Sequence, residues 1–271
     1  MLRRNKTKAL FISSAIFLNF GVQGVAENRP KIVGGSTAPI NKFQFQVALV
    51  EKQLLSNFHG QFCGGSLINN NTVVTAAHCL DGENINSLQV LVGTHDLENG
   101  GERVNVASLI IHPRYSPENS GFDYDVAVIK LKPNKKQETL LNRLPKAKLP
   151  SMTSKKLAPG TPVRVSGWGY LEEIGDDRPS KLHHVSVNVI DQNTCISMYK
   201  ASPITPRMIC AGILYLGGKD ACQRDSGGPL ILNENVLVGI VSWGLGCGEA
   251  KYPGVYSNVT ALREWIARMA W

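Results

Sequence analysis

The chain has 271 residues, of which 43% are hydrophobic, enough for one large domain or two smaller ones with a real core. Its formal net charge is +8, but the first 31 residues hold six basic residues and one acidic residue, which leaves 23 bases and 20 acids in the remainder. A net charge of +3 in that remainder gives no reason to expect nucleic acid as a partner.

The N-terminus has the pattern of a secretory signal peptide. Residues 1–8 are basic, residues 9–20 are apolar but too few to span a bilayer, and residues 21–26 end in small side chains. We therefore predict cleavage after Ala26 and secretion to the extracellular space. A membrane anchor is the alternative, and the shortness of the apolar run argues against it. Because no other apolar run approaches spanning length, we expect no membrane contact in the mature form.

The rest of the chain contains many glycines, prolines and short apolar runs, which favour strands joined by turns. Alternation with a period of two places four residues on one face of a strand, namely Phe43, Phe45, Val47 and Leu49. Further strands are predicted over residues 88–93, 103–111, 125–131, 161–169, 185–189 and 236–244.

Only the C-terminus has a convincing helical pattern. Residues 260–271 carry an apolar stripe, and Thr260 is the candidate N-cap. Four prolines between residues 145 and 162 mark a connector. We therefore expect two all-β halves of similar size.

The six cysteines favour disulfides, because the chain is predicted to be exported. Several pairings are possible, and the sequence alone does not choose among them. No pair of cysteines has the C-x-x-C spacing of zinc sites, so we expect no metal site.

The segment KDACQRDSGGP, residues 219–229, presents Ser226 ahead of two glycines and a proline, as a nucleophile on a tight turn would require. A serine hydroxyl is a poor nucleophile at neutral pH, so it needs a base to accept its proton and a carboxylate to orient that base. For the acid, Asp123 and Asp125 have the same strand parity, and periodicity does not separate them. Asp125 adjoins the buried run and is expected to be the more desolvated of the two.

His78 is the best candidate for the base, because it ends an apolar strand among small residues beside Cys79. His112 precedes Pro113 in an expected turn. Solvated side chains are expected for the other four histidines, His59, His95, His183 and His184.

Eight motifs in order resemble the chymotrypsin-like serine proteases, trypsin most closely, and the match covers residues 32–271. The motifs are IVGG at 32–35, CGGSLI at 63–68, TAAHC at 75–79, DVAVIKL at 125–131, GWG at 167–169, CQRDSGGPL at 222–230, SWG at 242–244 and PGVY at 253–256. The resemblance implies a general base at His78, an orienting acid at Asp125 and a nucleophile at Ser226. It also implies an oxyanion hole formed by the backbone N–H groups of Arg224 and Ser226.

The implied fold is all-β, with two antiparallel six-stranded β-barrels, the active site between them and a C-terminal helix on the second barrel. We expect an N-terminal barrel over about 32–145, a connector over about 146–162, and the C-terminal barrel and helix over about 163–271. The disulfide pairs implied by the resemblance are Cys63–Cys79, Cys195–Cys210 and Cys222–Cys247. Each loop closure would contribute roughly 3 kcal/mol on an entropic model.

The resemblance places Asp220 at the floor of the primary specificity pocket. A buried carboxylate without a partner favours a substrate side chain that brings a cation, so we expect polypeptide substrates cut after Arg or Lys. The resemblance aligns Gly244 and Gly254 with the pocket walls. Ser242 is also expected to bind substrate. Ala221 stands where many trypsins have a serine that helps to hold an ammonium group, so we predict a preference for Arg, whose guanidinium can pair bidentately with the acid.

The start of the matched region implies activation by cleavage. Lys31 precedes IVGG, so a trypsin-like activator would release residues 27–31 and create a new amino group on Ile32. In the family this ammonium inserts beside the acid before the nucleophile, here Asp225. We therefore expect a zymogen, and an outside activator, because Lys31 fits an Arg-preferring enzyme poorly.

The sequence also departs from trypsin. No cofactor is expected, and calcium is disfavoured, because Thr94 stands where a liganding acid is expected, although Glu98 and Glu102 remain. Arg224 replaces the usual glycine. It keeps its backbone N–H, so we expect an active enzyme with weakened binding of rigid protein inhibitors.

Residues 171–179 form an acidic segment that is expected near the cleft rim, where it would favour basic flanking residues in substrates or simply be solvated. We expect a monomer. The alternative function is a non-catalytic binding protein on the protease fold, which retention of His78, Asp125 and Ser226 argues against.

Overall fold

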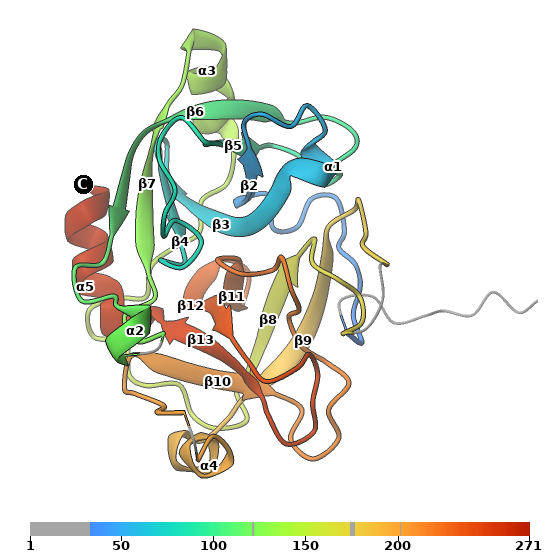
Figure 1. The fold of residues 1–271 in the computed structure, drawn as a ribbon, viewed down its shortest axis with the longest axis vertical. Helices are drawn as coiled ribbons and strands as arrows, with labels where there is room; N and C mark the ends of the chain where they lie inside the picture. Colours follow the sequence, from blue (N-terminus) through green and yellow to red (C-terminus); the bar gives the residue numbers. More distant parts are fainter. Residues whose placement is uncertain (1–32, 121, 174–176, 201) are drawn as a thin grey trace, which may run out of the picture.

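The computed structural model describes residues 33–120, 122–173, 177–200 and 202–271. The predicted signal peptide, the activation segment, Lys31 and Ile32 lie outside the described residues. Figure 1 shows two β-rich halves stacked along the long axis, with the later part of the chain forming the lower half.

Six antiparallel strands close into the first barrel in the order β2-β3-β4-β7-β6-β5. These strands are β2 (Gln46–Glu51), β3 (Gln61–Asn69), β4 (Thr72–Thr75), β5 (Leu88–Val92), β6 (Glu102–Ile111) and β7 (Ala127–Lys132). Three helices belong to this half: α1 (Asn57–Gly60), α2 (Pro117–Ser120) and α3 (Lys135–Arg143). Closure pairs β2 with β5, so the barrel leaves no unpaired edge.

The second barrel is a ring in the order β9-β10-β13-β12-β11-β8, closed by antiparallel pairing of β8 with β9. Its strands are β8 (Pro162–Gly167), β9 (His183–Val189), β10 (Met208–Gly212), β11 (Pro229–Leu232), β12 (Val236–Trp243) and β13 (Gly254–Asn258). The short strand β1 (Ser36–Thr37) pairs with β9 on the outside of this ring. Two helices follow strands of this half: α4 (Gln192–Met198) and α5 (Val259–Ala270).

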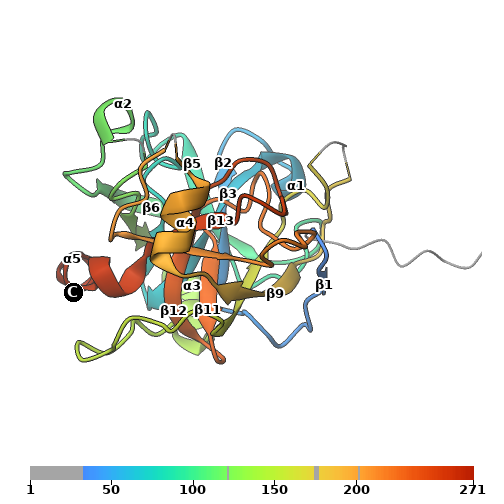
Figure 2. The same ribbon diagram turned by 90° about the horizontal axis from the view of Figure 1, so that it is seen from below.

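The predicted fold is confirmed, with two six-stranded antiparallel barrels and a C-terminal helix. Buried hydrogen bonds join the barrels, because Gln46 Nε2 donates to Ser166 O at 2.8 Å and Ser166 Oγ donates to Gln46 Oε1 at 2.6 Å. The helix α5 lies at one side of the molecule in Figures 1 and 2. Its buried residues join a hydrophobic core that includes side chains of both barrels, and Lys130 of β7 donates to Ala270 O at 2.7 Å.

One helical prediction was wrong, and two helices of seven or more residues were missed. The N-cap of α5 is Asn258, whose side chain accepts a hydrogen bond from Ala261 N, rather than Thr260. The helix α3 was not predicted, because most of its residues are polar and only Gln137 and Leu141 are buried. The helix α4 was not predicted either, and Asp191 caps its N-terminus.

The predicted face over residues 43–49 is also partly wrong. Phe43 has a φ of 55°, and β2 begins only at Gln46, so the first residues of this segment form a turn. Every residue from Gln46 to Val50 is buried, which hides the alternation.

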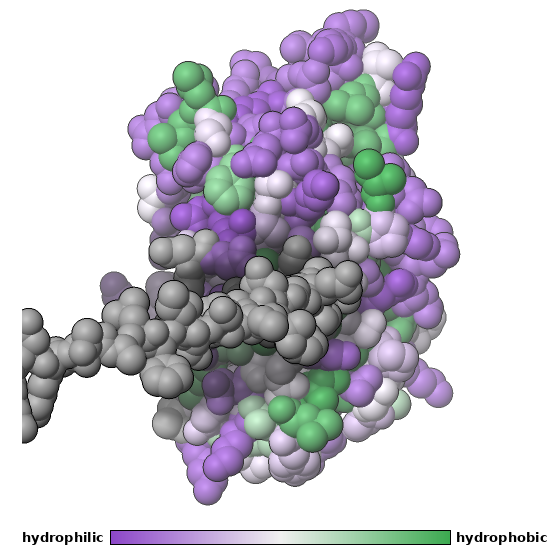
Figure 3. Space-filling model, turned by 90° about the vertical axis from the view of Figure 1, so that its right-hand side faces the viewer, coloured by the Kyte–Doolittle hydropathy of each residue, from purple (hydrophilic) through white to green (hydrophobic). Residues whose placement is uncertain are grey.

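The face in Figure 3 is mostly hydrophilic, with separate hydrophobic spots around the grey atoms. Scattered apolar residues of this kind are ordinary on a protein surface. No helix in the described part of the chain is long and apolar enough to cross a membrane.

Candidate active site

Ser226 lies on a tight turn between the two barrels. Asp225 N donates to Cys222 O at 3.0 Å and Gly228 N donates to Asp225 O at 2.9 Å, which closes the turn on both sides of the serine. The turn docks on the first barrel, because Gly64 N donates to Ser226 O at 2.7 Å. Gly227 has a φ of 78°, and a Cβ there would lie 2.2 Å from Thr75 Oγ1, so only glycine fits this contact.

His78 follows β4 and is held by Asp125, as the resemblance implies. Its ring Nδ1 lies 2.8 Å from Asp125 Oδ2, and its backbone N–H donates to Asp125 Oδ1 at 2.9 Å. The carboxylate is fully buried and also accepts from Ser242 Oγ at 2.5 Å. These three donors fix the carboxylate and orient the imidazole, so that Nε2 is the ring nitrogen left to exchange a proton. The hydroxyl of Ser242, predicted to bind substrate, is thus used by Asp125.

A turn between Asp123 and Asp125 overturns their expected common parity. Tyr124 has a φ of 57°, Val126 N donates to Tyr124 O at 2.7 Å, and β7 begins only at Ala127. The two aspartates therefore face different partners. Asp123 pairs with Arg207, whose Nη2 lies 2.5 Å from Oδ2 and whose Nε lies 3.1 Å from Oδ1. Burial raises the pKa of Asp123, but this ion pair outweighs it and lowers the pKa overall.

Ser226 and His78 are brought to the same edge of the first barrel, but no hydrogen bond between their side chains occurs among the described contacts. Hydrogen bonds of this kind are often long in a free enzyme and shorten when substrate binds. One prediction about the other histidines was wrong, because His183 is buried, with only 2% of its surface exposed. The turn expected at His112 is present, since Tyr115 N donates to His112 O at 2.9 Å, and the His112 ring is buried against Tyr124 and Trp265.

The backbone beside Ser226 presents two free amide donors. The N–H groups of Asp225, Gly227 and Gly228 all donate within the turn or to β12, whereas those of Arg224 and Ser226 donate to no acceptor in the described part of the chain. Arg224 has a φ of 74°, the left-handed conformation in which a non-glycine residue costs roughly 1–2 kcal/mol. The geometry provides two adjacent donors that could bind a developing oxyanion.

The side chain of Arg224 folds onto β3. Its Nη1 donates to Gln61 O, and Gln61 Nε2 donates back to Arg224 O at 2.9 Å. Gln61 is fully buried, so this reciprocal pair anchors the unusual backbone conformation. The guanidinium is thereby directed toward the wall of β3.

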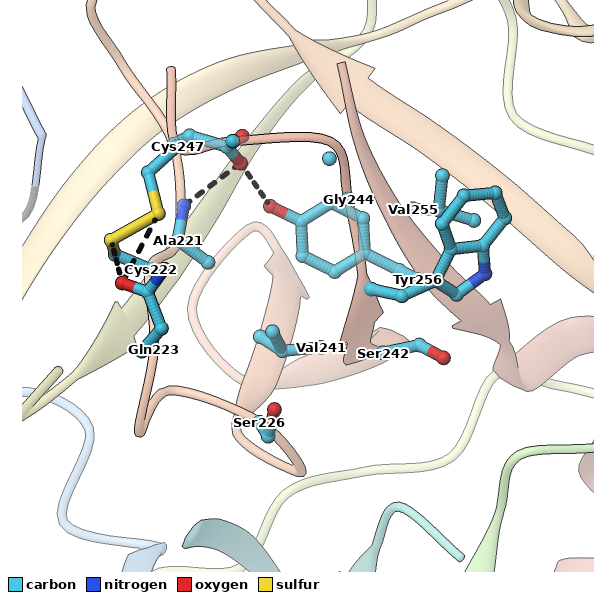
Figure 4. A pocket seen from close by; sticks show the side chains of 14 residues that line it. Ala221, Cys222, Gln223, Ser226, Val241, Ser242, Gly244, Cys247, Val255 and Tyr256 are labelled. Atoms are coloured by element: carbon cyan, nitrogen blue, oxygen red, sulfur yellow. Dashed lines mark hydrogen bonds between the residues drawn. A yellow bond between two sulfur atoms is a disulfide. The ribbon is translucent and has the colours of Figure 1, made fainter. Parts of the chain in front are cut away.

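A cavity of about 150 Å³ runs from Ser226 to Asp220. Figure 4 shows Ser226 and Tyr256 at different levels of this pocket, with the disulfide of Cys222 and Cys247 on one wall. The other predicted substrate-binding residues, Ala221, Ser242, Gly244 and Gly254, also line it. A Cβ at Gly254 would lie 2.5 Å from Asp220 Oδ1, whereas one at Gly244 would meet only Gly246 O at 3.5 Å and Tyr199 Oη at 4.0 Å.

Asp220 is 3% exposed and faces no basic side chain within salt-bridge distance among the described residues. Burial raises its pKa to about 7, although the N–H groups of Gly248 and Ala221 and the hydroxyl of Tyr256 donate to the carboxylate. Burial likewise raises the pKa of Asp225 to about 6, against hydrogen bonds from Cys222 N at 3.0 Å and Gly169 N at 2.7 Å. Both carboxylates are costly to ionise unless a cation joins them.

The structure contains the three disulfides that the resemblance implies, Cys63–Cys79, Cys195–Cys210 and Cys222–Cys247. The first ties β3 to the residue after His78. A close group of possible metal ligands, Cys63, His78 and Cys79, is explained by this disulfide, because its sulfurs are not free thiolates.

The segment after Gly93, where calcium is disfavoured by the sequence, forms a loop with internal hydrogen bonds. Thr94 Oγ1 lies 2.6 Å from Asp96 O and 2.9 Å from Asn99 O, so its hydroxyl closes the loop internally. The carboxylate of Glu102 is occupied by Lys136 at 2.5 Å. In this arrangement neither the Thr94 hydroxyl nor the Glu102 carboxylate is without a partner.

Two groups beside the site were missed in the sequence analysis. Phe122 contacts the ring of His78 edge-on at 5.7 Å, and Trp243 stacks with Phe122 at 6.3 Å, so aromatic rings flank His78 on one side. Arg178, the one basic residue of the acidic segment, reaches the buried Gln61. Neither arrangement has a local sequence signal, because each joins segments far apart in the chain.

Comparisons with known proteins agree with this geometry. Residues 32–266 match the family model Trypsin. The chain is 41% identical over 237 residues to Trypsin Blo t 3 of Blomia tropicalis, covering 87% of this chain and 84% of that protein. It is 40% identical over 239 residues to Trypsin of Sus scrofa, covering 87% and 94%, and 39% identical over 242 residues to Trypsin beta of Drosophila erecta, covering 89% and 88%.

The fold and these matches define a serine endopeptidase, a hydrolase that acts on polypeptides. The chain belongs to the trypsin family.

Proposed function

We propose that this protein is a secreted protease, made as a zymogen, that cuts polypeptides after Arg in preference to Lys. The observation that carries the proposal is the pocket beside Ser226, which ends on a buried carboxylate without a cation. A substrate guanidinium would supply that cation and remove the cost of ionising Asp220. No described feature favours the alternative of a non-catalytic binding protein.

The proposed reaction uses His78, Asp125 and Ser226 together. His78 Nε2 accepts the proton of Ser226 Oγ as that oxygen bonds to the carbonyl carbon of the substrate. The carbonyl oxygen becomes an oxyanion, which accepts hydrogen bonds from the N–H groups of Arg224 and Ser226. His78 then gives its proton to the leaving amine as the C–N bond breaks, and an ester remains on Ser226. Water, deprotonated by His78, hydrolyses this ester and restores the hydroxyl.

The preference for Arg rests on Ala221. Its side chain offers no hydroxyl at the floor of the pocket, so a lysine ammonium would lack a partner there, whereas a guanidinium can bind both oxygens of Asp220. Equal kcat/KM values for matched Arg and Lys peptides would overturn this preference.

We propose activation by cleavage after Lys31, which releases residues 27–31 and lets the amine of Ile32 pair with Asp225. Two observations support it. Asp220 N donates to Val33 O at 3.2 Å, so Val33, the first described residue, contacts a residue that lines the pocket. Asp225 is fully buried beside Gly167 and Gly169, where any Cβ would collide with its carboxylate, and the described residues give it no salt bridge.

The direct test is to purify the precursor, treat it with trypsin, determine the new N-terminus and measure hydrolysis of an arginine anilide. We expect an N-terminus at Ile32 and activity only after treatment. A Lys31→Gln precursor is the control, and it is expected to stay inactive. Labelling of Ser226 by a serine-directed phosphonate should appear only after cleavage, and a cleaved chain that is neither labelled nor active would support a binding protein instead.

The same proposal includes cleavage of the signal peptide after Ala26, a peptidase domain over residues 32–271, a monomeric mature form and no calcium requirement. It also includes weakened binding of rigid protein inhibitors. The side chain of Arg224 fills space on the wall of β3 beside the oxyanion donors, which glycine would leave open.

A further inference from the structure

Two arginines converge on Gln61 beside the oxyanion donors. Arg224 Nη1 donates to Gln61 O, and Arg178 Nη2 donates to Gln61 Oε1 and lies 3.4 Å from Gln61 O. Arg178 is fixed further by Phe58, because its Nη1 donates to Phe58 O at 2.5 Å and its guanidinium lies 4.6 Å from the centre of the Phe58 ring. The buried Gln61 therefore holds two like charges next to each other.

Neither guanidinium forms a salt bridge with a carboxylate of the described residues. Arg178 uses its donors on the oxygens of Trp168, Phe58 and Gln61. Burial and the charge of Arg224 lower the pKa of Arg178 to about 10, which reflects the cost of this arrangement. Asp225 offsets part of that cost, but its oxygens face Gly169 N and Cys222 N.

The charge pair lies on the leaving-group side of Ser226. The acyl side of a substrate is fixed by the Asp220 pocket, and the leaving amine must lie at His78, which protonates it. A leaving segment that runs from His78 along the disulfide Cys63–Cys79 would approach Gln61, two residues before Cys63. Since an extended segment advances about 3.3 Å per residue, the residue after the scissile bond would lie by the disulfide and the second one would reach the two arginines.

We propose that Arg178 and Arg224 form a carboxylate-binding subsite for the leaving segment, so that the enzyme prefers peptides with Asp or Glu as the second residue after the scissile bond. Both side chains are partly exposed, and the Nε and Nη2 groups of Arg224 donate to no described residue, so donors remain for a substrate carboxylate. This inference rests on the proposed function, since it assumes cleavage by Ser226.

For the acidic segment 171–179 two expectations were left open, a preference for basic flanking residues in substrates or a solvated segment. The proposed subsite differs from the first of these, because Arg178 of this segment donates to Phe58 and Gln61 on the wall of the cleft.

The test uses the activated protein and quenched peptides that share one acyl sequence ending in Arg and differ only in the second leaving-side residue: Glu, Gln or Lys. We expect kcat/KM for Glu to exceed that for Gln by about three- to ten-fold, as for two partly exposed ion pairs, and Lys to be worst. The advantage of Glu should shrink in 1 M salt, because such pairs are screened. Equal values for Glu and Gln, or a ratio that salt does not change, would overturn the inference.

Two matched variants distinguish an effect of the charge of Arg178 from an effect of the structural support that an arginine gives to a nearby loop. Arg178→Gln should reduce the preference for Glu by removing one of the two charges, whereas Arg103→Gln should leave it unchanged. Arg103 braces the loop before α1 in a similar way, with Nη1 2.6 Å from Leu54 O and Nη2 3.2 Å from Leu55 O. Loss of the preference in both variants would contradict a role for charge. If Arg178→Gln does not fold, the ratio of kcat/KM for the Glu and Gln peptides in the unaltered enzyme, and the dependence of that ratio on salt, still test the carboxylate subsite.

An arginine anilide has no leaving-side residues, so it tests the proposed function alone. Failure of the activated enzyme to hydrolyse it would contradict the proposed function. Hydrolysis of the anilide without discrimination between the Glu and Gln peptides would contradict only the carboxylate subsite.

Discussion

Replacement of Asp220 by Asn should stabilise the folded protein at pH 8, although it removes the proposed specificity. The carboxyl is 3% exposed, and burial raises its pKa from the ordinary 3.8 to about 7. At about 1.4 kcal/mol per pKa unit, keeping this group ionised costs the folded state roughly 4 kcal/mol above pH 7. Below about pH 3 the carboxyl is neutral in both folded and unfolded chains, so the cost is absent there, and at pH 4 only a small part of it remains.

The amide introduced by Asp220→Asn cannot reproduce every contact of the carboxylate. The amide oxygen can still accept from Ala221 N and Tyr256 Oη, but the amide nitrogen would face Gly248 N, which donates to Asp220 Oδ2 at 3.3 Å. Leaving that weak donor unpaired costs about 1 kcal/mol. We therefore expect Asp220→Asn to raise the free energy of unfolding by roughly 2–3 kcal/mol at pH 8 and to lower it by less than about 1 kcal/mol at pH 4.

The assay is urea denaturation of the mature chain at both pH values, in a Ser226→Ala background that prevents self-digestion. Asp123→Asn is the matched control, because Asp123 is also buried but pairs with Arg207, and its pKa is lowered. Its ionised form stabilises the fold, so this variant should be less stable than its parent at pH 8, with a smaller loss as pH falls below 4. An Asp220→Asn variant that is less stable than its parent at both pH values would refute the reasoning.

Three further predictions follow from single contacts. Gly254→Ala should lower kcat/KM for arginine substrates by at least about ten-fold, because the new Cβ would lie 2.5 Å from Asp220 Oδ1. Binding of benzamidine should weaken in parallel, and unchanged values would contradict the pocket assignment. Arg224→Gly should tighten a rigid protein inhibitor, measured as its Ki, more than it changes the Ki of benzamidine, and equal changes would contradict a role for the side chain. Addition of calcium or of a chelator should leave the Tm unchanged, and a calcium-dependent rise in Tm would show that the loop after Gly93 binds the ion.

Local patterns predicted many of the strands and two all-β halves, whereas the two six-stranded barrels were implied by the resemblance. The alternation in residues 185–189, for example, corresponds to β9, in which Val185, Val187 and Val189 are buried. The helix α3 was missed because its core contact is small, yet it carries a capping box in which Asn134 and Gln137 exchange hydrogen bonds, and that signal could have identified it.

The errors near the site have a different cause. Parity arguments assume an extended chain, and Tyr124 breaks the extension between Asp123 and Asp125 with a φ of 57°. The positive φ considered for Arg224 is present, at 74°, but the sequence did not indicate what would hold it. The partner is Gln61, which lies 163 residues away in the chain.

On each side of Ser226 the protein holds charged side chains that have no oppositely charged partner in the described part of the chain, and the sign of the charge differs between the two sides. On the acyl side, the buried carboxylate of Asp220 has no cation, and on the leaving-group side, Arg178 and Arg224 have no carboxylate within salt-bridge distance among the described residues. Each charge is held in place by backbone groups before substrate arrives, so little reorganisation is needed on binding. A peptide with Arg before the scissile bond and Glu two residues after it would satisfy both sides at once. Because the two contacts lie on opposite sides of the scissile bond, they would also align the chain across the oxyanion donors, and their combined effect should appear in kcat/KM for peptides rather than for anilides.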